Sequence, residues 1–185
     1  MRIISGTARG TKLVTLEGEY TRPTLDRVKE PLFSILQNDI IDATVLDLFS
    51  GSGALALESL SRGAEKAVLC DGSKKAVRVI EENVTKTKMQ EKAEVLLADY
   101  KVALKRLKEK GLVFDIVFLD PPYATDYDIQ AIEFIQNENL LSDNGIIVVE
   151  TDSDEKVEKI EKMNINILKI RKYGRVKLMF LNRKG

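Results

Sequence analysis

The sequence predicts one α/β domain organised around a mostly parallel sheet, and two observations lead to this prediction. From residue 44 onward, short apolar runs alternate with segments of helical periodicity, which is typical of parallel strands covered by helices on both faces. The chain has 185 residues, of which 44% are hydrophobic and 31% are charged, and these values suit one globular domain of ordinary size. A small extension is expected to precede this domain.

The first 43 residues differ in style from the rest and are expected to form that N-terminal extension. Apolar residues on either side of a turn rich in Gly, Ala and Arg (residues 6–10) predict a short β-hairpin. A loop at residues 21–24 leads into residues 25–38, whose apolar residues have helical spacing. Pro31 lies inside that segment, so the helix is expected to begin at it or kink near it.

Residues 44–185 are expected to form the main domain. Five near-continuous apolar runs predict parallel strands at residues 45–49, 67–70, 93–97, 116–119 and 146–149. Helical spacing is found at residues 54–62, 73–86, 101–110, 127–138 and 154–162. Two last apolar runs, residues 165–170 and 176–181, flank Gly174 and predict an antiparallel hairpin, which brings the sheet to seven strands.

Composition excludes several kinds of chemistry. The chain has no His and one Cys, so it can form neither an internal disulfide nor a His-based nucleophilic triad, and no metal site is expected. Acid–base work would therefore depend on carboxylates, Lys, Tyr or water. The first residues have no apolar signal-peptide core, and no apolar run has the length of a membrane span. We expect a soluble, cytoplasmic protein that does not contact membranes.

The first predicted strand runs into the turn Asp47-Leu-Phe-Ser-Gly51-Ser-Gly53. Glycines at a strand-to-helix turn let the backbone approach a ligand, and the helix start offers N–H groups. Asp71 ends the next strand, where a carboxylate can accept hydrogen bonds from ribose hydroxyls. Asp99 follows the third strand, either beside the same crevice or as a helix cap. The turn indicates a nucleoside-containing cofactor, with a purely structural tight turn as the alternative.

The fourth predicted strand ends in Asp120-Pro121-Pro122-Tyr123, at a sheet edge where ligands bind. An exocyclic amine on a nucleobase is a poor nucleophile, because its lone pair is delocalised into the ring. A carboxylate and a backbone carbonyl that accept its two N–H bonds favour a localised lone pair. Prolines fix φ and remove competing N–H donors, and a tyrosine offers a stacking face. The tetrapeptide therefore points to transfer of a group to a base amine rather than to a mere turn.

These motifs resemble the RsmD family of bacterial 16S rRNA guanine-N2 methyltransferases. Further resemblance lies in residues 2–10, 22–30, 60–64 and 173–177, so that it spans essentially the whole chain. It implies a Rossmann-like class I methyltransferase fold, S-adenosylmethionine as cofactor with S-adenosylhomocysteine as product, and a monomer acting on 16S rRNA, within the small ribosomal subunit.

The resemblance also implies roles for individual residues. Those expected to hold the cofactor are Asp47, Phe49, Ser50, Gly51, Gly53, Asp71, Gly72, Asp99 and Tyr100. Those expected to receive the guanine amine are Asp120, Pro121, Pro122 and Tyr123.

The net charge of zero hides an uneven distribution. Residues 1–29 have a net charge of +3 and residues 156–185 a net charge of +8, whereas residues 111–155 contain eleven acidic residues and no Lys or Arg. Basic ends can grip RNA phosphates, although solvated surface charge or protection of a sheet edge would also explain them. The residues expected to contact RNA are Arg2, Arg9, Lys12, Arg22, Thr24, Arg27 and Lys29.

Three other functions remain open at this point. A DNA adenine-N6 or cytosine-N4 methyltransferase would share the Asp-Pro-Pro-Tyr motif. A nicotinamide-dependent oxidoreductase would fit the looser glycine pattern G-x-G-x-x-A, but would leave that motif without a use. A non-catalytic RNA-binding module would bind the cofactor without transferring a methyl group.

Overall fold

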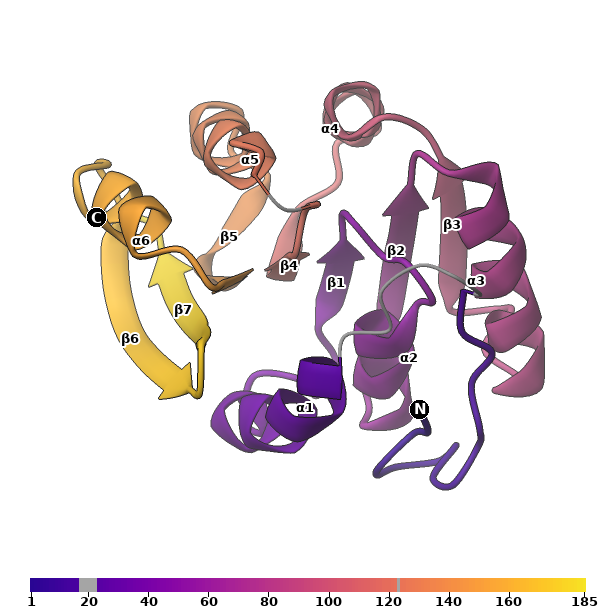
Figure 1. Cartoon of the computed structure of the whole chain (residues 1–185). Helices are drawn as coiled ribbons and strands as arrows, with labels where there is room; N and C mark the ends of the chain where they lie inside the picture. Colours follow the sequence, from indigo (N-terminus) through magenta and orange to yellow (C-terminus); the bar gives the residue numbers. More distant parts are fainter. Residues whose placement is uncertain (17–22, 123) are drawn as a thin grey trace.

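A seven-stranded sheet forms the centre of the protein (Figure 1). The computed structural model describes residues 1–16, 23–122 and 124–185, and for residues 23–26 it describes the backbone alone. The strand order is β3-β2-β1-β4-β5-β7-β6. The strands are β1 (Thr44–Asp47), β2 (Lys66–Asp71), β3 (Ala93–Leu97), β4 (Phe114–Leu119), β5 (Leu141–Thr151), β6 (Asn166–Tyr173) and β7 (Val176–Asn182).

Strands β1 to β5 run parallel, and β7 pairs antiparallel with both β5 and β6. The predicted mostly parallel sheet with its C-terminal antiparallel hairpin is therefore confirmed. The chain passes outward from β1 through β2 to β3 and then returns to β4 on the other side of β1. Such a reversal of direction opens a crevice at the carboxyl ends of β1 and β4, where doubly wound α/β proteins bind ligands.

Helices cover both faces of the sheet (Figure 1). On one face lie α1 (Pro23–Leu36), α2 (Ala54–Ser61) and α3 (Lys74–Lys86). On the other lie α4 (Tyr100–Glu109), α5 (Tyr127–Asn137) and α6 (Asp154–Glu161). The strands carry hydrophobic side chains on both faces, since both faces are covered by helices. Val45 and Phe118 pack toward the first group of helices, whereas Leu46 and Val117 pack toward the second.

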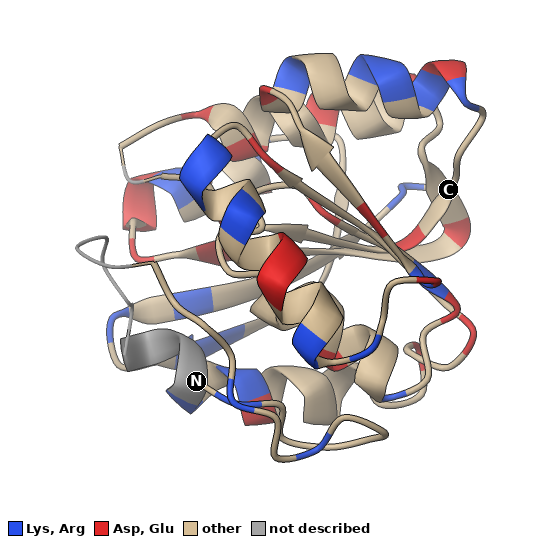
Figure 2. Cartoon of the chain, turned by 90° about the vertical axis from the view of Figure 1, so that its right-hand side faces the viewer, with Lys and Arg blue, Asp and Glu red and all other residues tan. Residues whose placement is uncertain are grey.

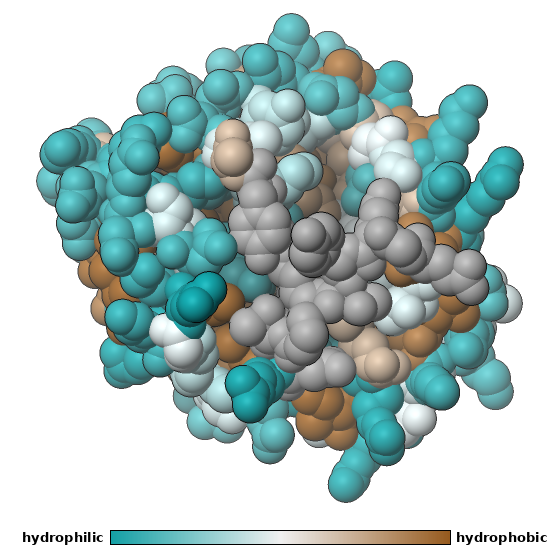
Figure 3. All heavy atoms as spheres, viewed as in Figure 1, coloured by the Kyte–Doolittle hydropathy of each residue, from teal (hydrophilic) through white to brown (hydrophobic). Residues whose placement is uncertain are grey.

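On the face that Figure 3 shows, the described residues are mainly hydrophilic, with hydrophobic residues scattered among them in small groups. Across the described residues, no helix is both long enough and apolar enough to cross a membrane.

The N-terminal segment differs from its prediction in two respects. Instead of a hairpin of two strands, a single antiparallel bridge joins Arg2 and Lys12. Of the two alternatives for Pro31, a helix that begins there is wrong, because α1 begins at Pro23 and contains Pro31. A proline at the first helical position loses no hydrogen bond, whereas one inside a helix costs about 3 kcal/mol. Burial of Leu32 and Phe33 on the same helix offsets that cost.

Residues 1–16 pack across α2, which is buried along its whole length. The approach is so close that a Cβ atom on Gly6 would lie 1.7 Å from the carbonyl oxygen of Ser61. Ile3 and Leu13 belong to the same hydrophobic cluster as the sheet residue Val45. The N-terminal segment thus shares its hydrophobic core with the main domain. That residues 1–43 form an RNA-contacting extension stays a prediction.

Candidate active site

The glycine turn lies between β1 and α2 and is held by backbone geometry. Gly51 and Gly53 have positive φ angles of 60° and 84°, which residues with side chains rarely adopt. The N–H of Ser50 donates to the carbonyl of Cys70 at 2.8 Å, and the N–H of Gly53 donates to the carbonyl of Ser50 at 2.8 Å. A Cβ on Gly53 would approach Leu69 to 3.0 Å. Gly53 therefore shapes the turn from inside, whereas Gly51 faces the cavity described below.

Asp71, at the end of β2, is fixed in place by the same turn. Its Oδ2 accepts the N–H of Gly51 at 3.0 Å, and its Oδ1 accepts the N–H of Ser73 at 2.9 Å. Each carboxylate oxygen has two lone pairs, so both retain capacity to accept another hydrogen bond. The carboxylate is thus oriented toward a ligand hydroxyl pair before any ligand binds.

A cavity of about 460 Å³ opens at the carboxyl ends of β1, β2 and β4. We call it the cofactor cavity. Every residue expected to hold the cofactor lines it except Gly53. Its other lining residues are Met1, Thr15, Leu16, Leu48, Ser52, Ala54, Leu55, Ala98, Asp120, Pro122 and Tyr127.

Three aromatic rings gather on one side of the cofactor cavity. The ring centroids of Tyr100 and Tyr127 are 4.7 Å apart in a stacked arrangement, and Phe49 lies 5.5 Å from Tyr100. The hydroxyl of Tyr100 bonds to the side-chain oxygen of Gln130, and burial raises its pKa above the ordinary value. Such rings offer a flat apolar surface to a purine. Tyr127 did not emerge from the sequence, because an exposed tyrosine at a helix start carries no motif.

Asp47 is buried at the end of β1 and has an unusual ionisation. Burial, together with the negative charges of Asp120 and Asp71, raises the pKa of its carboxyl group from 3.8 to about 7. The Ser50 hydroxyl, which donates to Oδ2 at 2.9 Å, lowers the pKa in part. Near neutral pH this carboxyl group is therefore poised between its two forms, and a cation beside it would favour the carboxylate.

The Asp-Pro-Pro loop follows β4 and separates two cavities. Asp120 and Pro122 line the cofactor cavity, and they also line a second cavity of about 310 Å³, together with Pro121. We call this second space the target cavity. Tyr123, expected to stack on the target base, lies outside the described residues.

Helix α6 anchors the residues that follow this loop. The hydroxyl of Thr125 donates to the carbonyl of Pro122 at 2.8 Å. The ammonium of Lys156 donates to the carbonyl of Thr125 at 2.7 Å and lies 3.0 Å from the Asp128 carboxylate, which is fully buried. The loop between β4 and α5 is thus held by side chains from more than one element.

Comparison with known proteins shows the family to which the chain belongs. The family model described as "Conserved hypothetical protein 95" matches residues 1–182. The chain belongs to this family. Ribosomal RNA small subunit methyltransferase D of Haemophilus influenzae is 39% identical over 175 residues, which cover 94% of this chain and 89% of that protein. The expected family and the class I methyltransferase fold are confirmed.

Solved structures give the same result for the fold. The structure of Escherichia coli yhhF superimposes with a TM-score of 0.83 at 34% identity and covers 100% of this chain and 98% of that one. A more distant neighbour, SMU.776 in complex with SAH, has a TM-score of 0.63 at 19% identity and covers 80% of this chain and 48% of that one. At that distance the likeness concerns the fold alone.

The residues expected to contact RNA fall into three groups: exposed residues, residues outside the described part of the chain, and the buried Lys29. Arg2, Arg9, Lys12 and Arg27 are exposed. Arg22 and the side chain of Thr24 lie outside the described residues.

Lys29 contradicts its prediction, because its side chain is fully buried and lies 2.9 Å from the Glu58 carboxylate. The Lys29 ammonium also donates to the carbonyl of Arg2, so this residue is an internal anchor, with no surface to offer a phosphate.

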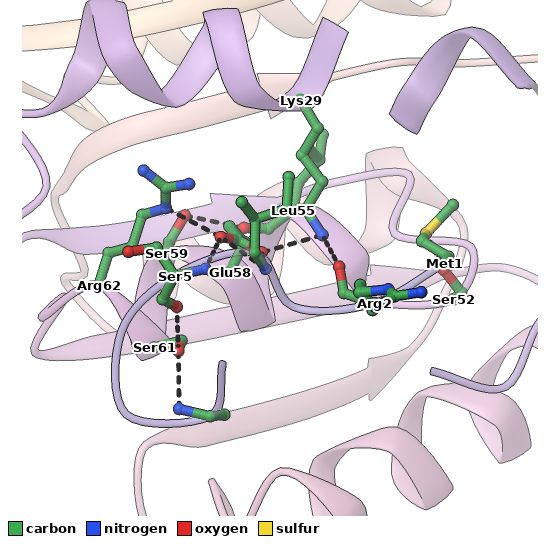
Figure 4. Close-up of polar contacts among 12 residues, drawn as sticks. Met1, Arg2, Ser5, Lys29, Ser52, Leu55, Glu58, Ser59, Ser61 and Arg62 are labelled. Atoms are coloured by element: carbon green, nitrogen blue, oxygen red, sulfur yellow. Dashed lines mark hydrogen bonds and ion pairs between the residues drawn. The ribbon is translucent and has the colours of Figure 1, made fainter. Parts of the chain in front are cut away.

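Figure 4 shows the network around Glu58, a residue that sequence reasoning missed. Its buried carboxylate accepts the N–H groups of Ile4 at 3.0 Å and Ser5 at 3.1 Å, and pairs with Arg62 at 2.9 Å as well as with Lys29. It thereby joins residues 1–16 and α1 to α2, the helix that starts at the glycine turn. A glutamate inside a short amphipathic pattern gives no sign of this role.

Asn83 on α3 makes a second tie to the glycine turn. Its side chain accepts the N–H of Val14 at 2.7 Å and donates to the carbonyls of Val14 at 2.9 Å and Ser52 at 2.8 Å. The residues that follow Val14, Thr15 and Leu16, line the cofactor cavity. The N-terminal segment therefore supplies part of the cavity wall and is fixed to the turn opposite.

Proposed function

We propose that the protein transfers a methyl group from S-adenosylmethionine to the exocyclic N2 amine of a guanine in 16S rRNA, in the small ribosomal subunit and hence in the cytoplasm. The observation that carries the proposal is the position of Asp120. This carboxylate borders both cavities, so it stands where an electrophile in one would meet an amine in the other. The name of the Haemophilus influenzae relative supports ribosomal RNA as the substrate.

The residues of the cofactor cavity fit S-adenosylmethionine. Asp71 presents an oriented carboxylate to the ribose, and the rings of Tyr100, Tyr127 and Phe49 suit the adenine. Asp47, whose pKa is about 7, suits the cationic methionine portion, because a neighbouring positive charge favours its ionised form. When bound, the cofactor supplies an electrophilic methyl group on a sulfonium.

Asp120 and the loop after it would prepare the amine. The Asp120 carboxylate accepts one N–H bond of the guanine N2 amine, and a loop carbonyl accepts the other, which favours a localised lone pair. With the cofactor bound, that lone pair would form the new N–C bond as the S–C bond breaks, and the N2 proton would then pass to water. Because both reactants are held in alignment, positioning can lower the barrier by about 7–11 kcal/mol without a strong base.

Charge supports RNA binding at the ends of the chain. On the side of the molecule seen in Figure 2, basic and acidic residues are mixed along α3. The exposed Arg2, Arg9 and Lys12 lie on the N-terminal segment, whose later residues border the cofactor cavity. We therefore place phosphate contacts on this segment, near the entrance to the active site.

The product identifies the reaction. Small subunits from a strain that lacks this methylation are incubated with the protein and labelled S-adenosylmethionine, and the rRNA nucleosides are analysed by mass. N2-methylguanosine is the expected product, and mapping then gives the modified nucleotide. A parallel incubation contains DNA in place of the subunits, and N6-methyladenine or N4-methylcytosine formed there, with no product in rRNA, would replace this proposal with the DNA methyltransferase alternative.

A further inference from the structure

The target cavity has a composition that the transfer reaction alone does not explain. Five of its lining residues are acidic, namely Asp120, Asp126, Glu150, Asp152 and Glu155, against the two basic residues Lys156 and Lys159. Both lysines already face carboxylates: Lys156 pairs with Asp128 at 3.0 Å, and Lys159 lies 3.2 Å from Glu155 and 3.4 Å from Asp126. Such a lining disfavours a phosphate and suits a neutral ligand rich in N–H donors.

Glu150 is the buried acid of this cavity. Its side chain is almost completely shielded, with 9% exposure, whereas Asp126, Asp152 and Glu155 are exposed. Glu150 lines the target cavity and does not line the cofactor cavity, in contrast to Asp120, which lines both. It therefore lies on the side of Asp120 where the acceptor of the methyl group would bind.

The register of the sheet brings Glu150 close to Asp120. Strands β4 and β5 are parallel, with Leu119 paired to Val149; Asp120 is the first residue after β4, and Glu150 is the next residue of β5. The two carboxylates thus leave neighbouring strands at the same level and border one cavity of about 310 Å³, within the usual range of ligand clefts of about 300–1,000 Å³.

Two adjacent carboxylates match one base in particular. The N2 amine of guanine lies between N1–H, a donor, and N3, an acceptor, so a carboxylate on the N1 side meets only donors. Adenine and cytosine present an amine beside a ring nitrogen that is an acceptor, and this nitrogen would face the carboxylate lone pairs. A carboxylate beside the reactive amine therefore accepts from guanine and repels the other two.

We propose that the target cavity binds the guanine base and that Glu150 selects it by accepting the N1–H, while Asp120 accepts from the N2 amine. Glu150 is thus a specificity-determining residue for the reaction proposed above, on which this inference depends. Its role is separable from cofactor binding, because it contacts only the target cavity.

The first test needs no variant. Once the methylated guanine has been mapped, small subunits are assembled from rRNA that carries 2-aminopurine at that position. This base keeps the 2-amine but has a lone pair in place of the N1–H. The wild-type protein should methylate it with a kcat/KM lower by about tenfold to a hundredfold. If it methylates 2-aminopurine as well as guanine, Glu150 does not select through N1–H and the inference is overturned.

The second test uses Glu150→Gln, which can donate to the N1 of 2-aminopurine through its amide. Its kcat/KM on guanine should fall by about tenfold to a hundredfold, its affinity for S-adenosylhomocysteine should stay within about twofold, and its preference for guanine over 2-aminopurine should shrink to about threefold or less. Glu161→Gln, an exposed change of the same charge on α6, serves as the control and should behave as wild type.

The two proposals fail in different ways. If the wild type forms no N2-methylguanosine, the proposed function is wrong. If it does so while Glu150→Gln keeps the wild-type rate and base preference, only the role of Glu150 is wrong. A Glu150→Gln protein that does not fold leaves the wild-type comparison of the two bases to decide.

Discussion

The cofactor cavity and the target cavity share Asp120 and Pro122, but they are built in different ways. The cofactor side is fixed mainly by the backbone: two glycines with positive φ and N–H groups that orient Asp71. The target side depends on side chains from separate elements, such as Lys156 on α6 and Glu150 on β5. A site shaped by backbone conformation can be predicted from residues that are close in sequence. A site formed by side chains from separate elements exists only after the chain has folded.

A buried ion pair provides the largest expected effect. Glu58→Gln would leave the Lys29 ammonium buried without its carboxylate partner and weaken the hold on residues 1–16. We expect the free energy of unfolding to fall by about 3–5 kcal/mol, measured by urea denaturation. Glu65→Gln, at an exposed position, is the control. A loss below about 1 kcal/mol would show that the Glu58 ion pair contributes little to the stability of the fold.

Asp120→Asn tests the catalytic role of the carboxylate that borders both cavities. An amide of the same shape keeps an oxygen acceptor but lacks the charge, so kcat should fall by about a hundredfold to a thousandfold, the range seen when one preorganised polar group is removed from an active site. Affinity for S-adenosylhomocysteine, measured by calorimetry, should change little. An Asp120→Asn protein with full activity would refute the catalytic role of this carboxylate.

Lys156 and Asp128 test the anchoring of the loop on the target side. The double variant Lys156→Met with Asp128→Asn removes both charges, so no buried charge is left unpaired, and Thr125 loses its donor. We expect kcat to fall about tenfold, because a loosened loop misplaces the amine, while cofactor affinity is kept. Lys162→Met, exposed at the end of α6, is the matched control. A parallel loss of cofactor affinity would show that the two sides are not independent.

Asp47 should make the affinity for the cofactor depend on pH. Since the pKa of this carboxyl group is about 7, binding of the cationic cofactor should release a proton, and affinity should rise with pH by up to about tenfold per unit below pH 7. Calorimetry between pH 5.5 and 8 measures this. Asp47→Asn should lose the dependence.

The stability of the ligand-free protein should change in the opposite direction and decrease as pH rises. A folded pKa raised above 3.8 means that ionisation of Asp47 destabilises the fold progressively as pH rises from about 4 through 7. Asp47→Asn should therefore be the more stable protein at pH 8. If it melts below wild type at that pH, the carboxylate is better accommodated in the fold than its burial implies.

Sequence patterns predicted the parts of the molecule whose physics is local. Strand periodicity located β1 to β7, and the glycine turn located the cofactor cavity, because positive φ restricts the residue type at Gly51 and Gly53. The expected N-terminal hairpin is limited to one bridge between Arg2 and Lys12, and the residues between its two arms bond to α2, as Ala8 does to Ser61. Lys29 was misplaced because surface exposure is the normal state of a lysine, and nothing near it in the chain shows its partner.

Local sequence patterns were enough to predict the sheet, the cofactor turn and, through the Asp-Pro-Pro-Tyr and N-terminal motifs, the family. Only the tertiary structure decided that Glu58 pins the N-terminal segment, that Tyr127 joins the aromatic wall and that Glu150 stands beside Asp120. The physical reason is distance along the chain. Backbone conformation depends on neighbouring residues, whereas an ion pair, a ring stack or a pair of carboxylates depends on elements that meet only when the sheet has formed.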